Sequence, residues 1–202
     1  MNRIDIIQSF INKLGAKAYL EIGVQGGSCF EAIKCEKKVG VDPDESSRAT
    51  VKLTSDEYFN RHNKMDARTE KEFFDVIFID GLHHADQVEK DILNALEHLN
   101  EGGVICVHDN LPTNKFMQEI PQQPSHNEWT GNGWETWVKL RQTRSDLEMY
   151  VVNTDWGVGV IKRGTQTPVV INLPITWENY AVHSSEWSNV ISVDQFKHKE
   201  GF

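Results

Sequence analysis

Short apolar runs and stretches of helical spacing alternate along the first half of the chain. Apolar runs predict five buried strands, over residues 18–23, 38–43, 49–59, 75–80 and 104–109. Apolar residues at helical spacing predict helices over residues 3–14 and over residues 88–99, where a pair of glycines ends the pattern. Ser28, with Glu31 three residues later, is a capping-box signal that predicts another helix from Ser28 onward. Because strands and helices alternate, we predict a mostly parallel sheet with helices on both faces.

The second half of the chain has a less regular pattern. Residues 111–133 are rich in proline, glutamine, asparagine and glycine, which predicts a long loop. We interpret this loop as a lid over a site, with a mobile linker as the alternative. A helix is predicted from Trp134 to about Arg144, and two strands joined around Asp155 predict an antiparallel C-terminal hairpin. We therefore expect one α/β domain over residues 1–202, with a doubly wound sheet.

The composition is that of an ordinary globular protein with an acidic balance. Of 202 residues, 39% are hydrophobic, and 21 basic against 30 acidic residues give a formal net charge of −9. Such a charge disfavours nucleic acids and anionic membranes as partners. No apolar run approaches the roughly 20 residues that span a bilayer, and an acid interrupts the apolar stretch of residues 1–15, which argues against a signal peptide. Three cysteines without a spacing pattern suit a reducing compartment, so we expect a cytoplasmic protein.

Charged residues gather where two neighbouring strands of the predicted sheet end. Asp80 ends the fourth predicted strand and Asp109 ends the fifth, with His83 and His108 close to them in sequence. In open α/β sheets, ligands bind at the carboxyl edge of the strands. The sequence therefore predicts a site at this edge, with two carboxylates and two imidazoles.

A glycine-rich turn follows the first predicted strand. The run EIGVQGG places Glu21 two residues before Gly23, and Gly27 four residues after it, which is not the spacing of the GxGxxG dinucleotide fingerprint. The amides at the start of the next helix, near Ser28, suit a carboxylate. Asp42 ends the second predicted strand, where its carboxylate can accept hydrogen bonds from a ribose diol. The combination predicts a nucleoside ligand; the alternative is a tight strand-to-helix connection.

Several of these segments resemble a known family. LEIGVQGGS, VGVDP and FDVIFIDG are similar to motifs of the class I S-adenosylmethionine-dependent methyltransferases, which have a Rossmann-like fold. TSDEYF, IDGLHHADQVEKDI and LNEGGVICVHDN resemble the small-molecule O-methyltransferase branch that includes the macrocin-type sugar methyltransferases. The resemblance covers residues 15–163 and is strongest in the half that carries the glycine turn. It implies S-adenosylmethionine as cofactor and a small-molecule or sugar acceptor.

The resemblance also implies roles for the residues of the glycine turn. Gly23 and its neighbours, including Gly27 and Ser28, would hold the methionine end of the cofactor. Glu21 would anchor the turn, and Asp42 would take the ribose hydroxyls.

The adenine contact is assigned to the end of the third predicted strand. Ser55 and Asp56 would lie against the base. The sequence MDA at 65–67 is the alternative for this turn.

The D-x-x-H pattern of the same branch falls on Asp80 and His83. It implies His83 as the base that accepts the proton of the acceptor hydroxyl, and Asp80 as a catalytic residue that also lines the cofactor site. Asp80, His108 and Asp109 are the predicted ligands of a divalent cation, which would lower the pKa of that hydroxyl. The branch usually has two acids where this chain has His108 and Asp109, and histidine suits Mn²⁺, Fe²⁺ or Zn²⁺ better than Mg²⁺. A metal-free reaction is the alternative.

Aromatic residues offer faces for an acceptor. Trp129 and Trp134 flank a glycine-rich turn after the predicted lid and serve either the acceptor or the core, whereas Trp137 and Trp156 are expected in the core.

Two further functional hypotheses stay open at this point. One is a non-catalytic nucleoside-binding module, and the other is a metal-dependent enzyme of another chemistry on the same fold. The oligomeric state is expected to be a monomer or a homodimer.

Overall fold

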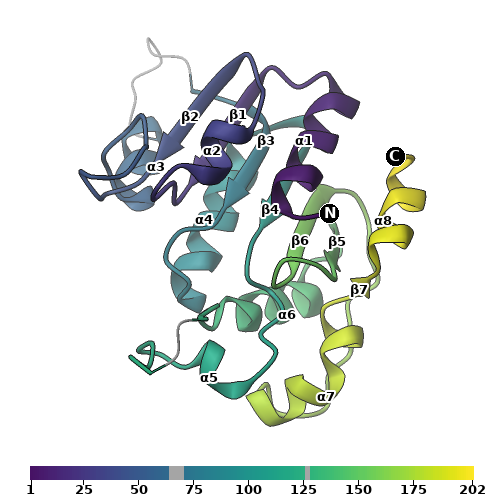
Figure 1. Ribbon diagram of the computed structural model, residues 1–202. Helices are drawn as coiled ribbons and strands as arrows, with labels where there is room; N and C mark the ends of the chain where they lie inside the picture. The colour runs from purple at the N-terminus through teal and green to yellow at the C-terminus, as the bar shows by residue number, and fades with distance from the viewer. Residues whose placement is uncertain (64–70, 126–127) are drawn as a thin grey trace.

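The computed structural model describes residues 1–63, 71–125 and 128–202, which form a sheet flanked by helices (Figure 1). The strands are β1 (Ala18–Ile22), β2 (Lys37–Val41), β3 (Phe74–Ile79), β4 (Leu99–Val107), β5 (Leu147–Val152), β6 (Val158–Arg163) and β7 (Val190–Ile191). The helices are α1 (Arg3–Leu14), α2 (Ser28–Ala32), α3 (Ser55–Asn63), α4 (Ala85–Glu97), α5 (Lys115–Gln118), α6 (Gly133–Thr143), α7 (Trp177–Trp187) and α8 (Val193–Glu200).

The sheet has the order β2-β1-β3-β4-β6-β5-β7. Neighbouring strands from β2 to β4 are parallel, and β6 runs antiparallel to both β4 and β5. The predicted α/β class, with a mostly parallel sheet and an antiparallel hairpin, is confirmed. Because Ile79 of β3 lies opposite Val107 of β4, the residues that follow these two strands emerge side by side at one edge.

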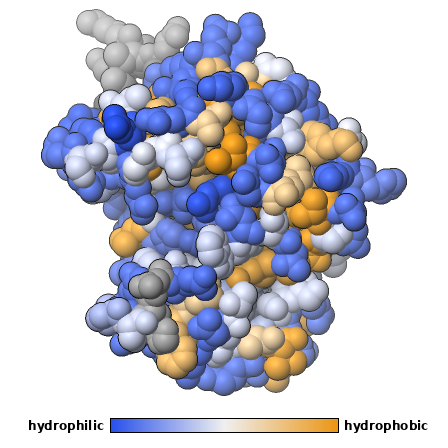
Figure 2. Space-filling model, viewed as in Figure 1, coloured by the Kyte–Doolittle hydropathy of each residue, from blue (hydrophilic) through white to orange (hydrophobic). Residues whose placement is uncertain are grey.

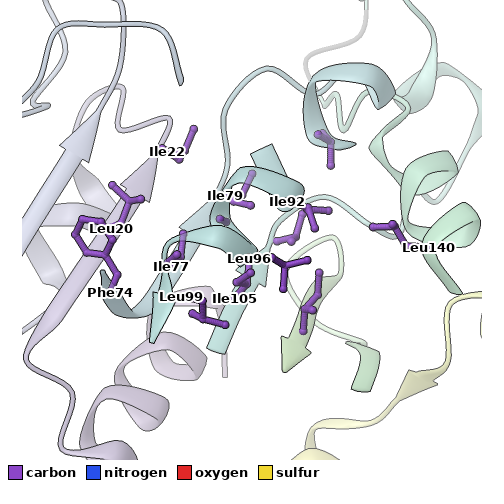
Figure 3. Close-up of a cluster of buried hydrophobic side chains, with 14 of the residues drawn as sticks. Leu20, Ile22, Phe74, Ile77, Ile79, Ile92, Leu96, Leu99, Ile105 and Leu140 are labelled. Carbon is purple, nitrogen blue, oxygen red and sulfur yellow. The ribbon is translucent and has the colours of Figure 1, made fainter. Parts of the chain in front are cut away.

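Alternate residues of the strands enter two hydrophobic clusters on opposite faces of the sheet. In β3, Ile77 and Ile79 face the cluster covered by α3, α4 and α6, while Val76 and Phe78 face the cluster covered by α1, α2 and α8. This alternation follows from the two-residue repeat of a strand. Figure 3 shows how Ile92 and other apolar residues of α4 reach the first cluster. Full burial of one such side chain contributes about 1.5–3 kcal/mol to stability.

The outer face is mainly polar. Figure 2 shows that hydrophilic residues cover most of the visible surface. None of the described helices is long and apolar enough to cross a membrane.

The predicted strand over residues 49–59 is wrong. Val51 makes a single parallel bridge with Val41, and the helix α3 begins at Ser55. The cause is a capping box: Thr54 Oγ1 accepts a hydrogen bond from the amide of Glu57, and the Glu57 carboxylate accepts one from the amide of Thr54. Such a T-x-x-E pair satisfies two free amides at a helix start and favours the helix over a strand.

The fifth predicted strand is longer than expected. It begins at Leu99 and passes through Gly102 and Gly103, which were expected to separate the helix from the strand. Gly103 has no room for a side chain, because an added Cβ would lie 2.8 Å from the carbonyl oxygen of Asp75. The two glycines therefore allow an irregular pairing with β3.

The C-terminal half contains more regular structure than the sequence pattern indicates. The predicted loop 111–133 includes the short helix α5, where Asn114 accepts hydrogen bonds from the amides of Phe116 and Met117. Near the end of the chain, β7 and α8 add two further elements, and Ser192 and Gln195 form a capping box at the start of α8.

Candidate functional site

The glycine turn after β1 can be built only with glycine at its first position. Gly23 has a φ of +86°, and an added Cβ would lie 2.1 Å from the carbonyl oxygen of Asp80. The amide of Gly23 donates to the carbonyl oxygen of Val41 at 2.9 Å, which fixes the turn against β2. Gly27, with a φ of +81°, then begins the helix α2 at Ser28. The backbone is therefore bare on the side that faces the end of β3.

Asp42 is held rigidly at the end of β2. Its Oδ2 accepts a hydrogen bond from the amide of Gln25 at 2.8 Å, and its Oδ1 accepts one from the amide of Asp44 at 2.9 Å. Each carboxylate oxygen can accept a further hydrogen bond. Asp42 thus offers two fixed acceptors, which is what a ribose diol requires.

Glu21 lies buried beneath the glycine turn. Its Oε2 accepts a hydrogen bond from the Tyr19 hydroxyl at 2.5 Å. Burial raises the pKa of Glu21 to about 7, and the charge of Asp80 acts in the same direction. Its hydrogen bond with Tyr19 fixes the side chain within the core.

A first cavity of about 520 Å³ lies between the glycine turn, the end of β2, the start of α3 and the segment after β3. The residues that line it include Gly23, Asp42, Ser55, Asp56 and Asp80. Five of the eight predicted cofactor residues therefore meet around one space.

The other three predicted cofactor residues do not line this cavity. Glu21 lies beneath the turn, and Gly27 and Ser28 form the start of α2. The alternative adenine turn at 65–67 lies outside the described residues.

A second cavity of about 540 Å³ adjoins the first. Asp80, Gly81, Leu82 and Gln25 line both cavities. The residues found in the second cavity alone include Arg3, His83, His108, Asp109, Trp129 and Trp156. The carboxyl edge of the sheet thus carries two spaces that meet beside Asp80.

His83 is oriented by two elements. Its Nδ1 lies 2.7 Å from Oδ2 of Asp109, and its ring stacks on Trp129 with centroids 5.4 Å apart. Its Nε2 lies 3.5 Å from Oδ1 of Asp80, beyond a direct hydrogen bond with ordinary geometry. Burial lowers the pKa of His83, but the hydrogen bond with Asp109 and the nearby carboxylates outweigh burial and raise it above its usual value.

His108 lies deeper than His83 and contacts the start of α1. Nη1 of Arg3 lies 2.5 Å from Nε2 of His108, and Nδ1 of His108 lies 3.0 Å from Oδ1 of Asp109. Burial lowers the pKa of His108, but hydrogen bonds with Asp109, Asp155 and Asp80 raise it to about 11.

Arg3 is a site residue that the sequence pattern does not reveal. Its amide donates to Oδ2 of Asp155 at 2.9 Å, so the turn between β5 and β6 anchors the start of α1. Figure 1 shows the beginning of the chain beside these strands. Asp155 is in a turn, as expected, with a φ of +49°. It also contacts the site, because its Oδ1 lies 3.7 Å from Nε2 of His108.

A metal-ligating group is present at the same edge. Among the described residues, ligand atoms of Asp80, His83 and Asp109 lie within 4.8 Å of one another. The sequence-predicted set names His108 in place of His83. In the structure, His108 contacts both aspartates but also faces the guanidinium of Arg3.

The end of the predicted lid packs directly on His83. The carbonyl oxygen of Thr130 lies 3.2 Å from Nδ1 of His83, and the amide of Asn132 donates to the His83 carbonyl oxygen at 3.0 Å. Gly131 between them has a φ of +62°, and an added Cβ would lie 2.0 Å from that carbonyl oxygen. This part of the segment therefore fixes the position of the imidazole.

The tryptophans divide differently from the expectation. Trp134 and Trp137 are fully buried in the core, and Trp134 stacks on Tyr180. Trp129 and Trp156 line the second cavity. Trp156, expected in the core, is 41% exposed because the β5–β6 turn directs it towards His108.

Comparisons with known proteins agree with this geometry. Residues 20–110, just under half of the chain, match the model of a family described as a methyltransferase domain. No curated protein matches the chain in sequence. The family match covers the glycine turn, Asp42 and both strand ends that carry Asp80 and Asp109.

Solved structures with a similar fold include methyltransferases. An O-methyltransferase from Bacillus cereus in complex with S-adenosylhomocysteine superposes with a TM-score of 0.55 at 18% identity, over 79% of this chain and 78% of that chain. TomG, an O-methyltransferase from Streptomyces achromogenes in complex with S-adenosylmethionine, gives a TM-score of 0.53 at 17% identity, over 79% of this chain and 77% of that chain. A methyltransferase from Podospora anserina, PaMTH1, bound to S-adenosylhomocysteine, gives a TM-score of 0.52 at 16% identity, over 80% of this chain and 78% of that chain.

The family match and the fold together confirm the resemblance stated from the sequence. Residues 20–110 match a methyltransferase domain, and the solved structures that share the fold of the chain include O-methyltransferases.

Proposed function

We propose that this protein transfers the methyl group of S-adenosylmethionine to a hydroxyl group of a small-molecule or sugar acceptor, with His83 as the general base. One observation carries the proposal. His83 lies in the second cavity beside Asp80, which also lines the first cavity, and Asp109 orients its ring at 2.7 Å. A base is thus held at the junction of two ligand-sized spaces.

The first cavity suits the cofactor. The turn at Gly23 leaves a bare backbone surface where any Cβ would collide, and Asp42 presents two fixed acceptors for the ribose hydroxyls. Ser55 and Asp56 line the part of the cavity assigned to the base. When bound, S-adenosylmethionine supplies a methyl group on a sulfonium, which is a good leaving group.

The chain has to position the acceptor and strengthen its oxygen as a nucleophile. Since Nδ1 of His83 donates to Asp109, the lone pair of Nε2 is free for the hydroxyl proton. The acceptor oxygen would take the methyl group from the cofactor held at Gly23 and Asp42, whose sulfur would keep the electron pair of the broken carbon–sulfur bond. The hydroxyl proton goes to Nε2 of His83.

The aromatic walls of the second cavity support a ring-shaped acceptor. Trp129 and Trp156 both line this cavity, and their indole faces suit packing against the apolar face of a sugar or another flat ring. The segment 111–133 would act as the lid, because its Trp129 and Thr130 contact His83.

A divalent cation fits the same edge. Asp80 and Asp109 offer hard oxygen ligands and His108 offers an imidazole, while His83 stays free to act as the base; this mixed set suits Mn²⁺, Fe²⁺ or Zn²⁺ more than Mg²⁺. A cation there would lower the pKa of the acceptor hydroxyl. Treatment with EDTA, followed by return of Mg²⁺ or Mn²⁺, tests this part: loss and recovery of turnover support a cation, and unchanged turnover supports the metal-free route.

The proposed activity is tested by product analysis. The protein is incubated with S-adenosylmethionine and a panel of sugar and phenolic acceptors, and S-adenosylhomocysteine is measured by chromatography. We expect turnover that His83→Ala abolishes and that the control His183→Ala, on α7, retains. If calorimetry shows no S-adenosylmethionine binding, or if His83→Ala turns over as well as the unchanged protein, the proposal is wrong.

A further inference from the structure

Gln87, in the first turn of α4, lines the first cavity with a fixed orientation of its side-chain amide. Its Nε2 lies 3.2 Å from Ser55 Oγ, 3.0 Å from Asp56 Oδ1 and 3.1 Å from Asp91 Oδ1. A carboxamide nitrogen only donates hydrogen bonds, and a carboxylate only accepts them. The acceptors on α3 and α4 therefore hold the NH₂ group of Gln87 on their side.

Asp91 is the buried member of this network. It is 1% exposed, and its Oδ2 has no hydrogen-bond partner among the described residues. Burial raises the pKa of Asp91 to about 6, although hydrogen bonds with Ser55 and Gln87 lower it. A buried carboxylate with one unsatisfied oxygen is costly. Asp91 lies one helical turn after Gln87, so its carboxylate opposes a flip of the Gln87 amide that would exchange Nε2 and Oε1.

The other atom of the amide, Oε1, is an acceptor, and it belongs to a residue that lines the first cavity. Asp42 lies in the same cavity, at the end of β2, and Gln87 lies beside Ser55 and Asp56, where the base is assigned. An acceptor in this position is complementary to an exocyclic amine. It repels a carbonyl oxygen, which is what a hypoxanthine or guanine base presents at the same place.

We propose that Gln87 is a specificity-determining residue for the cofactor, and that its Oε1 accepts a hydrogen bond from the 6-amino group of adenine. Asp56 and Asp91 are positioning residues that set the orientation of the amide. The inference rests on the proposed function, because it requires that the first cavity binds the adenosyl group.

Calorimetry with two ligands tests the inference without any knowledge of the acceptor. The ligands are S-adenosylhomocysteine and its 6-deamino analogue, in which hydrogen replaces the amino group. We expect the unchanged protein to bind the analogue roughly 10- to 100-fold more weakly, since loss of the donor leaves Oε1 unsatisfied. We expect Gln87→Leu to bind both ligands with equal affinity, close to that of the unchanged protein for the analogue.

Two further variants keep the result interpretable. Gln87→Met preserves the length of the side chain and is expected to behave as Gln87→Leu does; it replaces that variant if thermal unfolding shows a folding defect. Gln8→Leu, on α1 and outside both cavities, removes a surface amide that bonds Asn12 and Lys34, and is expected to keep the full discrimination.

The outcomes separate this inference from the proposed function. Equal binding of both ligands by the unchanged protein, or full discrimination by Gln87→Leu and Gln87→Met, overturns the role of Gln87 and leaves the methyltransferase proposal intact. Absence of S-adenosylhomocysteine binding by the unchanged protein overturns both. Discrimination that only the Gln87 variants lose supports the inference.

Discussion

The two cavities share a wall but are built in different ways. Backbone groups make the decisive features of the first cavity: the bare turn at Gly23, and the amides that hold the Asp42 carboxylate. Side chains from distant parts of the chain make the second cavity, which Arg3, Trp129 and Trp156 all line. Short motifs therefore encode the first cavity, whereas the second exists only after the sheet has formed. Variants on the first side should affect cofactor binding, and variants on the second side should affect turnover alone.

The largest effect is expected from Gly23→Ala. The new Cβ would collide with the Asp80 carbonyl oxygen at 2.1 Å, and the positive φ is unfavourable for alanine. We expect a loss of stability of about 3 kcal/mol and no measurable binding of S-adenosylhomocysteine. Chemical denaturation and calorimetry measure the two effects. Gly26→Ala is the matched control, because a Cβ there meets nothing within 4 Å. Equal losses of stability and binding in both variants would contradict the special requirement for glycine at position 23.

Asp109→Asn tests the second cavity, which Asp109 lines. The substitution keeps the size of the side chain, but a carboxamide has one accepting oxygen and no charge, so it cannot accept charge-assisted hydrogen bonds from both His83 and His108 as the carboxylate does. We expect kcat to fall by about 100-fold or more, with the affinity for S-adenosylhomocysteine unchanged. Steady-state kinetics and calorimetry measure the split. Asp194→Asn, on α8 and outside both cavities, serves as the control. A parallel loss of cofactor affinity would contradict the division between the cavities.

The difference between the cavities also explains how far the sequence could predict this molecule. The roles of Gly23 and Asp80 depend on a strand and the turn that follows it, so local pattern places both at the right edge. The strand expected over 49–59 was wrong because the capping pair of Thr54 and Glu57 determines that segment. Arg3 carries no local signal at all, since its contact with the site depends on how α1 lies on the finished sheet.

Asp91→Asn tests whether the buried carboxylate behind Gln87 destabilises the folded protein. The folded-state pKa of Asp91 is raised to about 6, above the unfolded value near 4, so the folded protein binds the extra proton between these values. Stability therefore falls as pH rises through this window, and the cost is complete above about pH 6. We expect Asp91→Asn to add about 2 kcal/mol at pH 7 and nothing at pH 4. Denaturant unfolding at both pH values measures this, and an equal gain at pH 4 would contradict the assigned cause.

Arg3→Ala is expected to have the smallest effect. It tests whether a residue of the second cavity can change kcat without changing cofactor affinity. The guanidinium lies 2.5 Å from Nε2 of His108, and His108 in turn contacts Asp109 at 3.0 Å. Its removal loosens the wall behind His83, so we expect kcat to fall about 10-fold, equivalent to about 1.4 kcal/mol, with cofactor affinity unchanged. The amide of Arg3 still donates to Asp155 in the variant, so the start of α1 stays in place.

Two comparisons decide whether the Arg3 effect is local. Arg3→Lys should recover part of the lost turnover, because an ammonium can replace one donor of the guanidinium but not its planar geometry. Arg144→Ala removes an arginine that pairs with Asp146 on the surface, and should leave kcat unchanged. If Arg3→Ala weakened S-adenosylhomocysteine binding as much as it lowered kcat, Arg3 would act on both cavities. The two cavities would then not be functionally separate.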